Sequence, residues 1–155
     1  RLKRERQLDL RIRAVANSRK MLRSDTTLAS LDLERGEPLD LDAFAKHVKS
    51  EHIPHALIVD CSGRADMAER YEGWLAQGIH VVTPSKHAGS GDARQLAALH
   101  AAGAKTGARF RYEATVGAGL PVVMTLRNLI DTGDTPRSIA GLFSGTLAWL
   151  FNHYD

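Results

Sequence analysis

The sequence has only one cysteine, Cys61, so no disulfide can form within the chain. A reducing compartment such as the cytoplasm is therefore the expected location. No apolar stretch approaches the roughly 18 residues that a membrane-spanning helix needs, so we expect no membrane partner. The first six residues, RLKRER, lack the apolar core of a signal peptide.

Several motifs of nucleotide and metal chemistry are also missing. The chain contains no G-x-G-x-x-G, no Walker loop and no zinc-type spacing of Cys and His. Gly89 and Gly91 flank a serine, but the third glycine is absent and no strand pattern precedes them. The net charge is only +3 and the basic residues are scattered, which argues against a nucleic-acid partner.

What is present is the composition of an ordinary globular domain of 155 residues, 43% hydrophobic and 25% charged. Strand patterns alternate with helix patterns, which favours a Rossmann-like parallel sheet with helices on both faces. The run 56–60 is continuously apolar up to its last residue, so we expect that strand to be buried on both faces. Residues 21–38 are polar and turn-rich and predict a loop, with room for a short helix. The remaining expected strands are 8–16, 79–83, 109–113 and 138–143, and the expected helices are 40–48, 64–77, 92–106, 120–130 and one from 146 onward.

Ligands of such sheets bind beyond the carboxyl ends of the strands, so the residues after each strand are candidate site residues. After the first strand come Asn17, Arg19 and Lys20. A neutral residue followed by two cations would tolerate or prefer the 2′-phosphate of NADP, and the alternative is a solvent-exposed turn. Ser62 follows the second strand and either approaches a ligand or caps the segment from residue 64. Its neighbour Cys61 is expected to be a small buried side chain.

The later strands carry further candidates. Lys86 and His87 follow the third strand, where a lysine can hold a carboxylate or a cofactor oxygen. Glu113 and the glycine-rich turn after it offer one carboxylate and backbone carbonyls, the hard oxygen ligands of an alkali or alkaline-earth ion. The alternative is an ordinary strand-to-helix turn. Gly145 and Thr146 start the last helix, where the hydroxyl is either a cap or a substrate contact.

Nearly the whole chain resembles homoserine dehydrogenase, most closely the dehydrogenase part of bifunctional aspartokinase/homoserine dehydrogenases. The segments that carry the resemblance, in order, are DLRIRAVANS (9–18), IVDCS (58–62), HVVTPSK (80–86), TVGAGLPV (115–122) and LFSGTL (142–147). It implies NAD(P)-dependent interconversion of L-homoserine and L-aspartate 4-semialdehyde, within threonine, methionine and isoleucine biosynthesis.

The resemblance also implies residue roles. Ser62 stands where the family has a Thr or Ser that touches the cofactor, and Lys86 stands at the lysine between nicotinamide and substrate. Gly145 and Thr146 match a turn that meets homoserine and nicotinamide. A sodium site is implied at Glu113 with the carbonyls of Val116, Ala118 and Leu120.

The family pattern implies two parts and a homodimer or higher homo-oligomer. Residues 1–116 would form the NAD(P)-binding Rossmann-like domain, and residues 117–155 would begin an α+β substrate and dimerisation domain. The chain lacks the glycine-rich loop expected before Arg1, His87 replaces a second lysine, and the family's proton donor lies beyond Asp155. We therefore expect little or no turnover from this chain alone. A related semialdehyde or dihydrodipicolinate-type reductase and a non-catalytic fragment are the alternatives.

Overall fold

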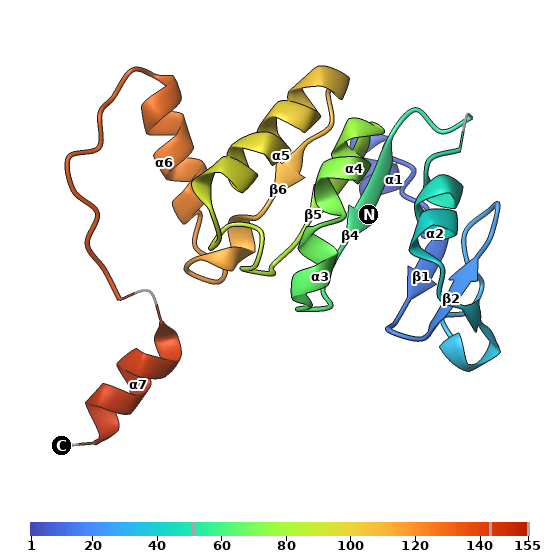
Figure 1. The fold of residues 1–155 in the computed structure, drawn as a ribbon, viewed down its shortest axis with the longest axis horizontal. Coiled ribbons are helices and arrows are strands. Elements are labelled where there is room, and N and C mark those ends of the chain that lie inside the picture. Colours follow the sequence, from blue (N-terminus) through green and yellow to red (C-terminus); the bar gives the residue numbers. More distant parts are fainter. Residues whose placement is uncertain (51, 143, 155) are drawn as a thin grey trace.

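The computed structural model describes residues 1–50, 52–142 and 144–154, and Figure 1 shows its elements along the chain. The helices are α1 (Leu2–Arg6), α2 (Leu41–Val48), α3 (Ala65–Ala68), α4 (Tyr71–Ala76), α5 (Ala93–Thr106), α6 (Val122–Asp131) and α7 (Gly145–His153), with 3₁₀ turns η1 (Leu33–Arg35) and η2 (Glu113–Thr115). The strands are β1 (Ala14–Ala16), β2 (Lys20–Arg23), β3 (Glu37–Pro38), β4 (Ala56–Val59), β5 (Ile79–Val82) and β6 (Phe110–Arg111).

A parallel sheet of order β4-β5-β6 forms the centre of the fold and confirms the Rossmann-like prediction. Ile58 lies opposite Val81, and Val81 lies opposite Phe110. The crossovers between these strands contain α3 with α4 and then α5, as expected for parallel neighbours. The expected helix 64–77 is divided into α3 and α4, and Gly78 ends it with a φ of 79°, a conformation that glycine adopts without strain.

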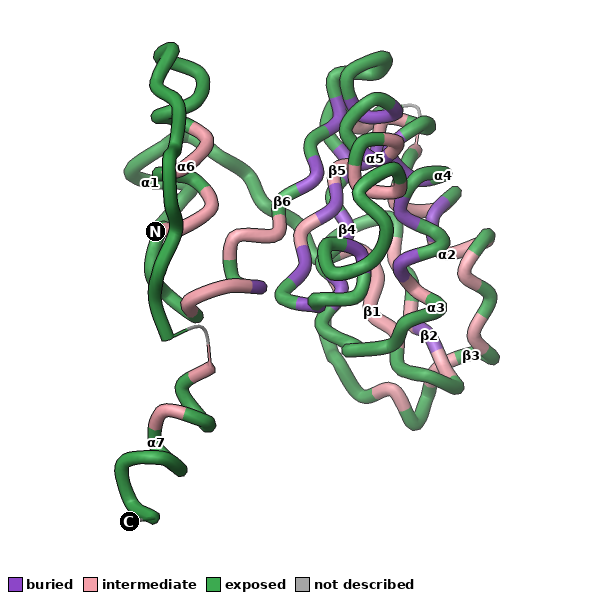
Figure 2. The backbone as a smooth tube through the Cα atoms, turned by 60° about the vertical axis from the view of Figure 1, so that its left-hand side comes forward, coloured by how far each residue is buried: buried purple, intermediate pink, exposed green. Residues whose placement is uncertain are grey.

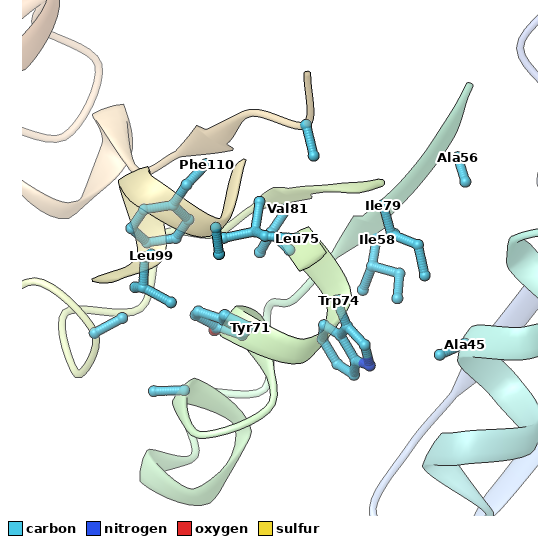
Figure 3. Close-up of a cluster of buried hydrophobic side chains, with 14 residues drawn as sticks. Ala45, Ala56, Ile58, Tyr71, Trp74, Leu75, Ile79, Val81, Leu99 and Phe110 are labelled. Carbon is cyan, nitrogen blue, oxygen red and sulfur yellow. The ribbon is translucent and has the colours of Figure 1, made fainter. Parts of the chain in front are cut away.

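The hydrophobic core lies between this sheet and the pair α4 and α5 (Figure 3). Leu75 of α4, Leu99 of α5 and Val81 of β5 are almost completely buried. Tyr71 packs its ring against Trp74 and Phe110, with centroid separations of 6.0 and 5.8 Å. Burying side chains of this size contributes about 1.5–3 kcal/mol each, so this face stabilises the position of the strands.

The opposite face of β4 is open, and the prediction that this strand is buried on both faces is wrong. Ala56 and Ile58 are buried, whereas Leu57 and Val59 are 42% and 58% exposed. Successive side chains of a strand point to opposite faces, and α4 and α5 pack on the face that carries Ile58. In the described sheet β4 is also an edge strand, because it pairs only with β5.

The first expected strand is much shorter than predicted. Only Ala14–Ala16 is a strand, and it pairs with β2 in an antiparallel hairpin. β2 in turn pairs with β3, so these strands form a second sheet inside the segment that we expected to be a loop. The expected short helix there is η1. Leu8, Leu10 and Ile12 keep their period-two pattern but are more than half exposed, because they find no described strand to pair with.

The remaining helices follow the sequence closely until the carboxyl-terminal part. Asp40 caps α2 by accepting from the amides of Asp42 and Ala43, as predicted. No strand forms in residues 138–142, and Phe143 lies outside the described residues. Figures 1 and 2 show α7 apart from both sheets at the end of an extended segment, and it buries none of its residues. Within the described ranges, no helix has the length and apolar character needed to cross a bilayer.

Candidate functional site

The loops at the carboxyl ends of the parallel strands lie along one edge of the sheet. In Figure 1 the connections after β4 and β5, the turn η2 and the turn between β1 and β2 all face the lower edge of the view. This is the edge at which doubly wound sheets bind ligands.

The loop after β4 begins with a buried carboxylate and continues with exposed residues. Asp60 is 4% exposed and its Oδ1 accepts a hydrogen bond from the amide of Ser62 at 2.8 Å. The Ser62 hydroxyl is exposed and accepts from the amide of Arg64 at 3.3 Å. The residue at the N-cap of α3 is Arg64, so Ser62 does not cap that helix.

Cys61 in the same loop is exposed, so the expectation that it is buried is wrong. The inward positions continue the alternation of β4, from Ala56 through Ile58 to Asp60. Cys61 therefore falls on the outward side.

The loop after β5 lies next to the loop after β4. Thr83 and Ser85 are buried, whereas Lys86 is exposed, and its carbonyl accepts from the amides of Gly89 and Ser90. His87 Nε2 lies 3.1 Å from the carbonyl oxygen of Gly63. This contact joins the two loops, so the structure brings Ser62 and Lys86 to neighbouring loops at one edge.

A buried polar network underlies both loops, and the sequence analysis missed it. Tyr71 of α4 donates to Asp60 Oδ2, and Thr83 Oγ1 donates to the carbonyl oxygen of Asp60 at 2.8 Å. Burial raises the pKa of the Tyr71 hydroxyl well above its usual value, and its hydrogen bond to Asp60 adds to the rise. The available signal was Asp60 itself, a carboxylate at the end of an apolar strand, which needs buried partners.

Glu113 lies in η2, and its side chain contacts the start of α6. Its Oε1 accepts from the amide of Met124 at 3.1 Å. Of the predicted ion-ligand carbonyls, that of Leu120 accepts from the amide of Val122, while the turn itself contains Ala118 at a φ of 51°. Val116 precedes this turn in an extended conformation. Among the described residues no group of three or more His, Cys, Asp and Glu side chains is arranged for a metal ion.

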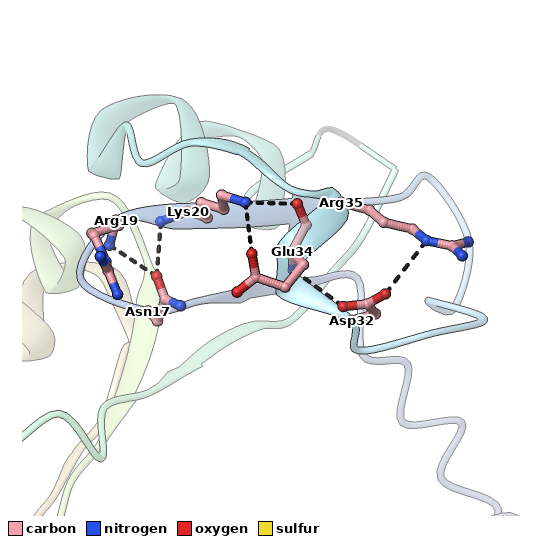
Figure 4. Close-up of polar contacts among 6 residues, drawn as sticks. All are labelled: Asn17, Arg19, Lys20, Asp32, Glu34 and Arg35. Atoms are coloured by element: carbon pink, nitrogen blue, oxygen red, sulfur yellow. Dashed lines mark hydrogen bonds and ion pairs between the residues drawn. The ribbon is translucent and has the colours of Figure 1, made fainter.

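The candidates after β1 lie in the tight turn to β2 (Figure 4). The Asn17 side chain accepts from the amides of Arg19 and Lys20, both at 2.8 Å, and so holds the turn. Lys20 Nζ donates to the Glu34 carbonyl at 2.6 Å and lies 3.2 Å from Glu34 Oε2. Arg19 makes no ion pair with any residue that the structure describes, which leaves its guanidinium as the available cation of this turn.

Gly145 and Thr146 form the first turn of α7, where Ser144 Oγ accepts from the amide of Leu147 at 3.2 Å. Because α7 lies apart from the sheet, the structure does not bring Gly145 and Thr146 to the loops with Lys86 and Glu113 (Figure 1).

Comparison with known proteins gives one consistent result. The family described as "Homoserine dehydrogenase, NAD binding domain" matches residues 1–113. The chain is 45% identical over 159 aligned residues to bifunctional aspartokinase/homoserine dehydrogenase 1, chloroplastic, of Arabidopsis thaliana, covering 99% of this chain and 18% of that protein. It is 44% identical over 99 residues to bifunctional aspartokinase/homoserine dehydrogenase 2 of Escherichia coli, covering 64% of this chain and 12% of that protein. The chain therefore spans less than a fifth of these relatives.

Solved structures agree on the fold. A Candida auris protein of unknown function superposes with a TM-score of 0.78 at 29% identity, covering 88% of this chain and 39% of the other. A candidate homoserine dehydrogenase from Archaeoglobus fulgidus gives a TM-score of 0.58 at 26% identity, covering 83% of this chain and 42% of the other. The family match covers more than two thirds of the chain, and the parallel sheet with loops at its carboxyl edge agrees with it. This chain therefore belongs to the homoserine dehydrogenase family, with the NAD-binding domain matched over residues 1–113.

Proposed function

We propose that the chain supplies the dinucleotide-binding part of an NAD(P)-dependent homoserine dehydrogenase. The reaction interconverts L-homoserine and L-aspartate 4-semialdehyde: the alcohol carbon gives a hydride to the nicotinamide and the hydroxyl releases a proton. The observation that supports this most directly is the adjacency of the Ser62 and Lys86 loops at the carboxyl edge of the sheet, joined by the His87–Gly63 contact.

The residues at this edge have the chemistry that a dinucleotide needs. Ser62 offers an exposed hydroxyl beside Gly63, whose φ of 67° lets the backbone turn close to a ligand. Arg19 offers a guanidinium that pairs with no carboxylate of the described residues in the turn after β1, suited to a 2′-phosphate, with Asn17 holding that turn. This arrangement favours NADP over NAD.

Lys86 is proposed to contact both the cofactor and the substrate. Lys86 is exposed, and the backbone of its loop is fixed because the Lys86 carbonyl accepts hydrogen bonds from the amides of Gly89 and Ser90. A point charge there would hold the substrate carboxylate or the reacting oxygen in place. Gly145 and Thr146 are proposed to complete the substrate site, which requires α7 to approach the sheet.

We further propose a sodium ion at Glu113 with the carbonyls of Val116, Ala118 and Leu120. One carboxylate with backbone oxygens is a hard donor set that fits an alkali ion. The left-handed residues Gly117 and Ala118 turn the chain sharply between these carbonyls. We also propose that residues 1–116 form the dinucleotide domain and that residues 117–155 begin a substrate and dimerisation domain of a cytoplasmic homodimer or higher homo-oligomer.

Titration of the chain with NADPH, followed by nicotinamide fluorescence, tests the cofactor assignment. We expect saturable binding that Lys86→Ala weakens by about tenfold or more, the usual effect of losing a hydrogen bond to a charged group. Lys105→Ala is the matched control, because Lys105 lies in the last turn of α5, at the opposite end of that helix from the Lys86 loop. Absence of saturable binding would favour a non-catalytic fragment instead.

The substrate is tested with a protein in which the remaining dehydrogenase segments of a relative are joined to this chain. We expect reduction of NADP that depends on homoserine. Preferential turnover of a dihydrodipicolinate-type substrate would instead assign the chain to that class of reductase.

A further inference from the structure

Three buried polar residues lie beneath the two loops and outside the set proposed to touch the cofactor. Asp60, Tyr71 and Thr83 are 4%, 0% and 1% exposed. We propose that they are positioning residues that fix the separation of the Ser62 and Lys86 loops. This inference rests on the proposed function for its purpose, though not for its geometry.

Asp60 fixes the root of the first loop. Its own amide donates to the carbonyl of Val82 at 3.0 Å, which extends the ladder between β4 and β5 by one bond. Its Oδ1 accepts from the amide of Ser62 at 2.8 Å, so the backbone at residue 62 is held against the end of the sheet.

Thr83 fixes the root of the second loop and joins it to the first. Its hydroxyl donates to the Asp60 carbonyl at 2.8 Å and accepts from the amide of Ser85 at 2.9 Å. A single buried hydroxyl therefore connects the backbones of both loops. Neither bond faces competition from water, because Thr83 is almost fully buried.

Tyr71 connects the network to the hydrophobic core. Its ring packs among the aromatic side chains of the core, while its hydroxyl donates to Asp60 Oδ2 and lies 3.4 Å from Thr83 Oγ1. A carboxylate this buried must have hydrogen-bond partners. The orientation of Asp60, and with it the position of Ser62, is thus set by a side chain of α4.

The exposed contact between His87 and Gly63 joins the same loops on their outer side. Since water competes for that contact, the buried network is the stronger of the two links. A ligand that spans both loops binds more tightly when their spacing is fixed beforehand, because less conformational entropy is lost on binding.

Thr83→Val tests the proposal, with Thr106→Val as a matched control. The Thr106 hydroxyl also joins two backbone groups, donating to the Leu75 carbonyl at 2.7 Å and accepting from the Ala108 amide at 3.3 Å. Thr106 is the last residue of α5 and lies in no site loop, and it is more exposed than Thr83. Both substitutions remove a hydroxyl with a donor and an acceptor partner. Amide hydrogen exchange and NADPH affinity are measured for each variant at the same temperature and salt.

In Thr83→Val we expect amide exchange at residues 61–64 and 85–90 to accelerate by about tenfold, the effect of one lost hydrogen bond, and NADPH affinity to fall by a similar factor. Thr106→Val should leave those amides and the affinity unchanged, and Thr83→Ser should restore both. Equal effects of Thr83→Val and Thr106→Val, or no local acceleration in Thr83→Val, would overturn the proposal.

Tyr71→Phe is the second variant, because it keeps the ring in the core and removes only the hydroxyl. Relative to the unsubstituted protein, we expect Tyr71→Phe to accelerate exchange of the Ser62 amide more than exchange of the amides within α5. The exchange measurement needs no cofactor. If the unsubstituted protein fails to bind NADPH, the proposed function fails while the exchange data still decide the positioning role.

Discussion

The turn between β1 and β2 gives a sharp prediction about cofactor choice. Arg19 and Lys20 are adjacent cations, but the structure treats them differently: Lys20 is paired with Glu34, and Arg19 has no such partner among the described residues. Arg19→Ala should therefore weaken NADPH binding far more than Lys20→Ala does.

The magnitude follows from the contacts. A hydrogen bond to a charged group contributes about 1.5–3 kcal/mol, so losing the contact of Arg19 with a 2′-phosphate should cost roughly tenfold to 150-fold in NADPH affinity. NADH lacks that phosphate and should lose little. The Lys20 ammonium is already 2.6 Å from a carbonyl oxygen and 3.2 Å from a carboxylate, so Lys20→Ala should change NADPH affinity by less than about threefold.

The assay is fluorescence titration of each variant with NADPH and with NADH at two salt concentrations. Glu34→Gln is informative as well, because it removes the carboxylate that neutralises Lys20 while the contact of Lys20 with the Glu34 backbone carbonyl remains; it should strengthen NADPH binding at low salt. The reasoning is refuted if Arg19→Ala weakens the two cofactors equally, or if Lys20→Ala matches Arg19→Ala.

Three further predictions concern stability. Because burial raises the pKa of Tyr71, the folded state keeps this proton above pH 10 while the unfolded state releases it, so the free energy of unfolding should fall by about 1.4 kcal/mol per pH unit above that value. Urea unfolding at several alkaline pH values measures this slope, and Tyr71→Phe should lack that part of it. Burial, and then the charge of Arg127, lowers the pKa of His100 below 6.5, so the unfolded state binds more protons in acid and stability should fall as the pH drops below that value; His100→Gln should flatten this loss, and an unchanged acid slope would contradict it. Gly103→Ala should destabilise the fold by about 1–3 kcal/mol in thermal or urea unfolding, because the added Cβ would lie 2.5 Å from the Ala108 carbonyl, and this clash outweighs the gain of about 1 kcal/mol in helix propensity; a variant with raised stability would show that the turn after α5 yields.

The elements set by local signals were predictable from the sequence. Asp40 predicts the start of α2, because its side-chain oxygen can cap the helix. The apolar run before Asp60 predicts a strand of the parallel sheet. The antiparallel hairpin was not predictable in the same way. The alternating pattern of residues 8–16 fits a strand in many positions and does not say which strand pairs with it. Here the partner is β2, which follows directly after the Asn17 turn.

The same limit applies to the site. The rule that ligands bind beyond the strand ends was enough to name Ser62, Lys86 and Glu113 as candidates, and their roles stay predictions. The rule did not predict the Asp60–Tyr71–Thr83 network. Tyr71 was expected to pack its ring in the core, and the pattern gave no sign that its hydroxyl bonds to Asp60. Nor did it reveal that Lys20 is neutralised by Glu34, a residue 14 positions away.

The open side of β4 has a practical consequence for work with this chain. Among the described residues β4 pairs only with β5, and an edge strand with adjacent apolar side chains is a template for pairing with another copy. Concentrated preparations should therefore self-associate through this edge. The substitution Val59→Lys would place a charge on the exposed face of β4. It should discourage such edge-to-edge pairing without disturbing the packed face of the strand. A modest surface change of this kind would make the chain easier to concentrate for the titrations and exchange measurements described above.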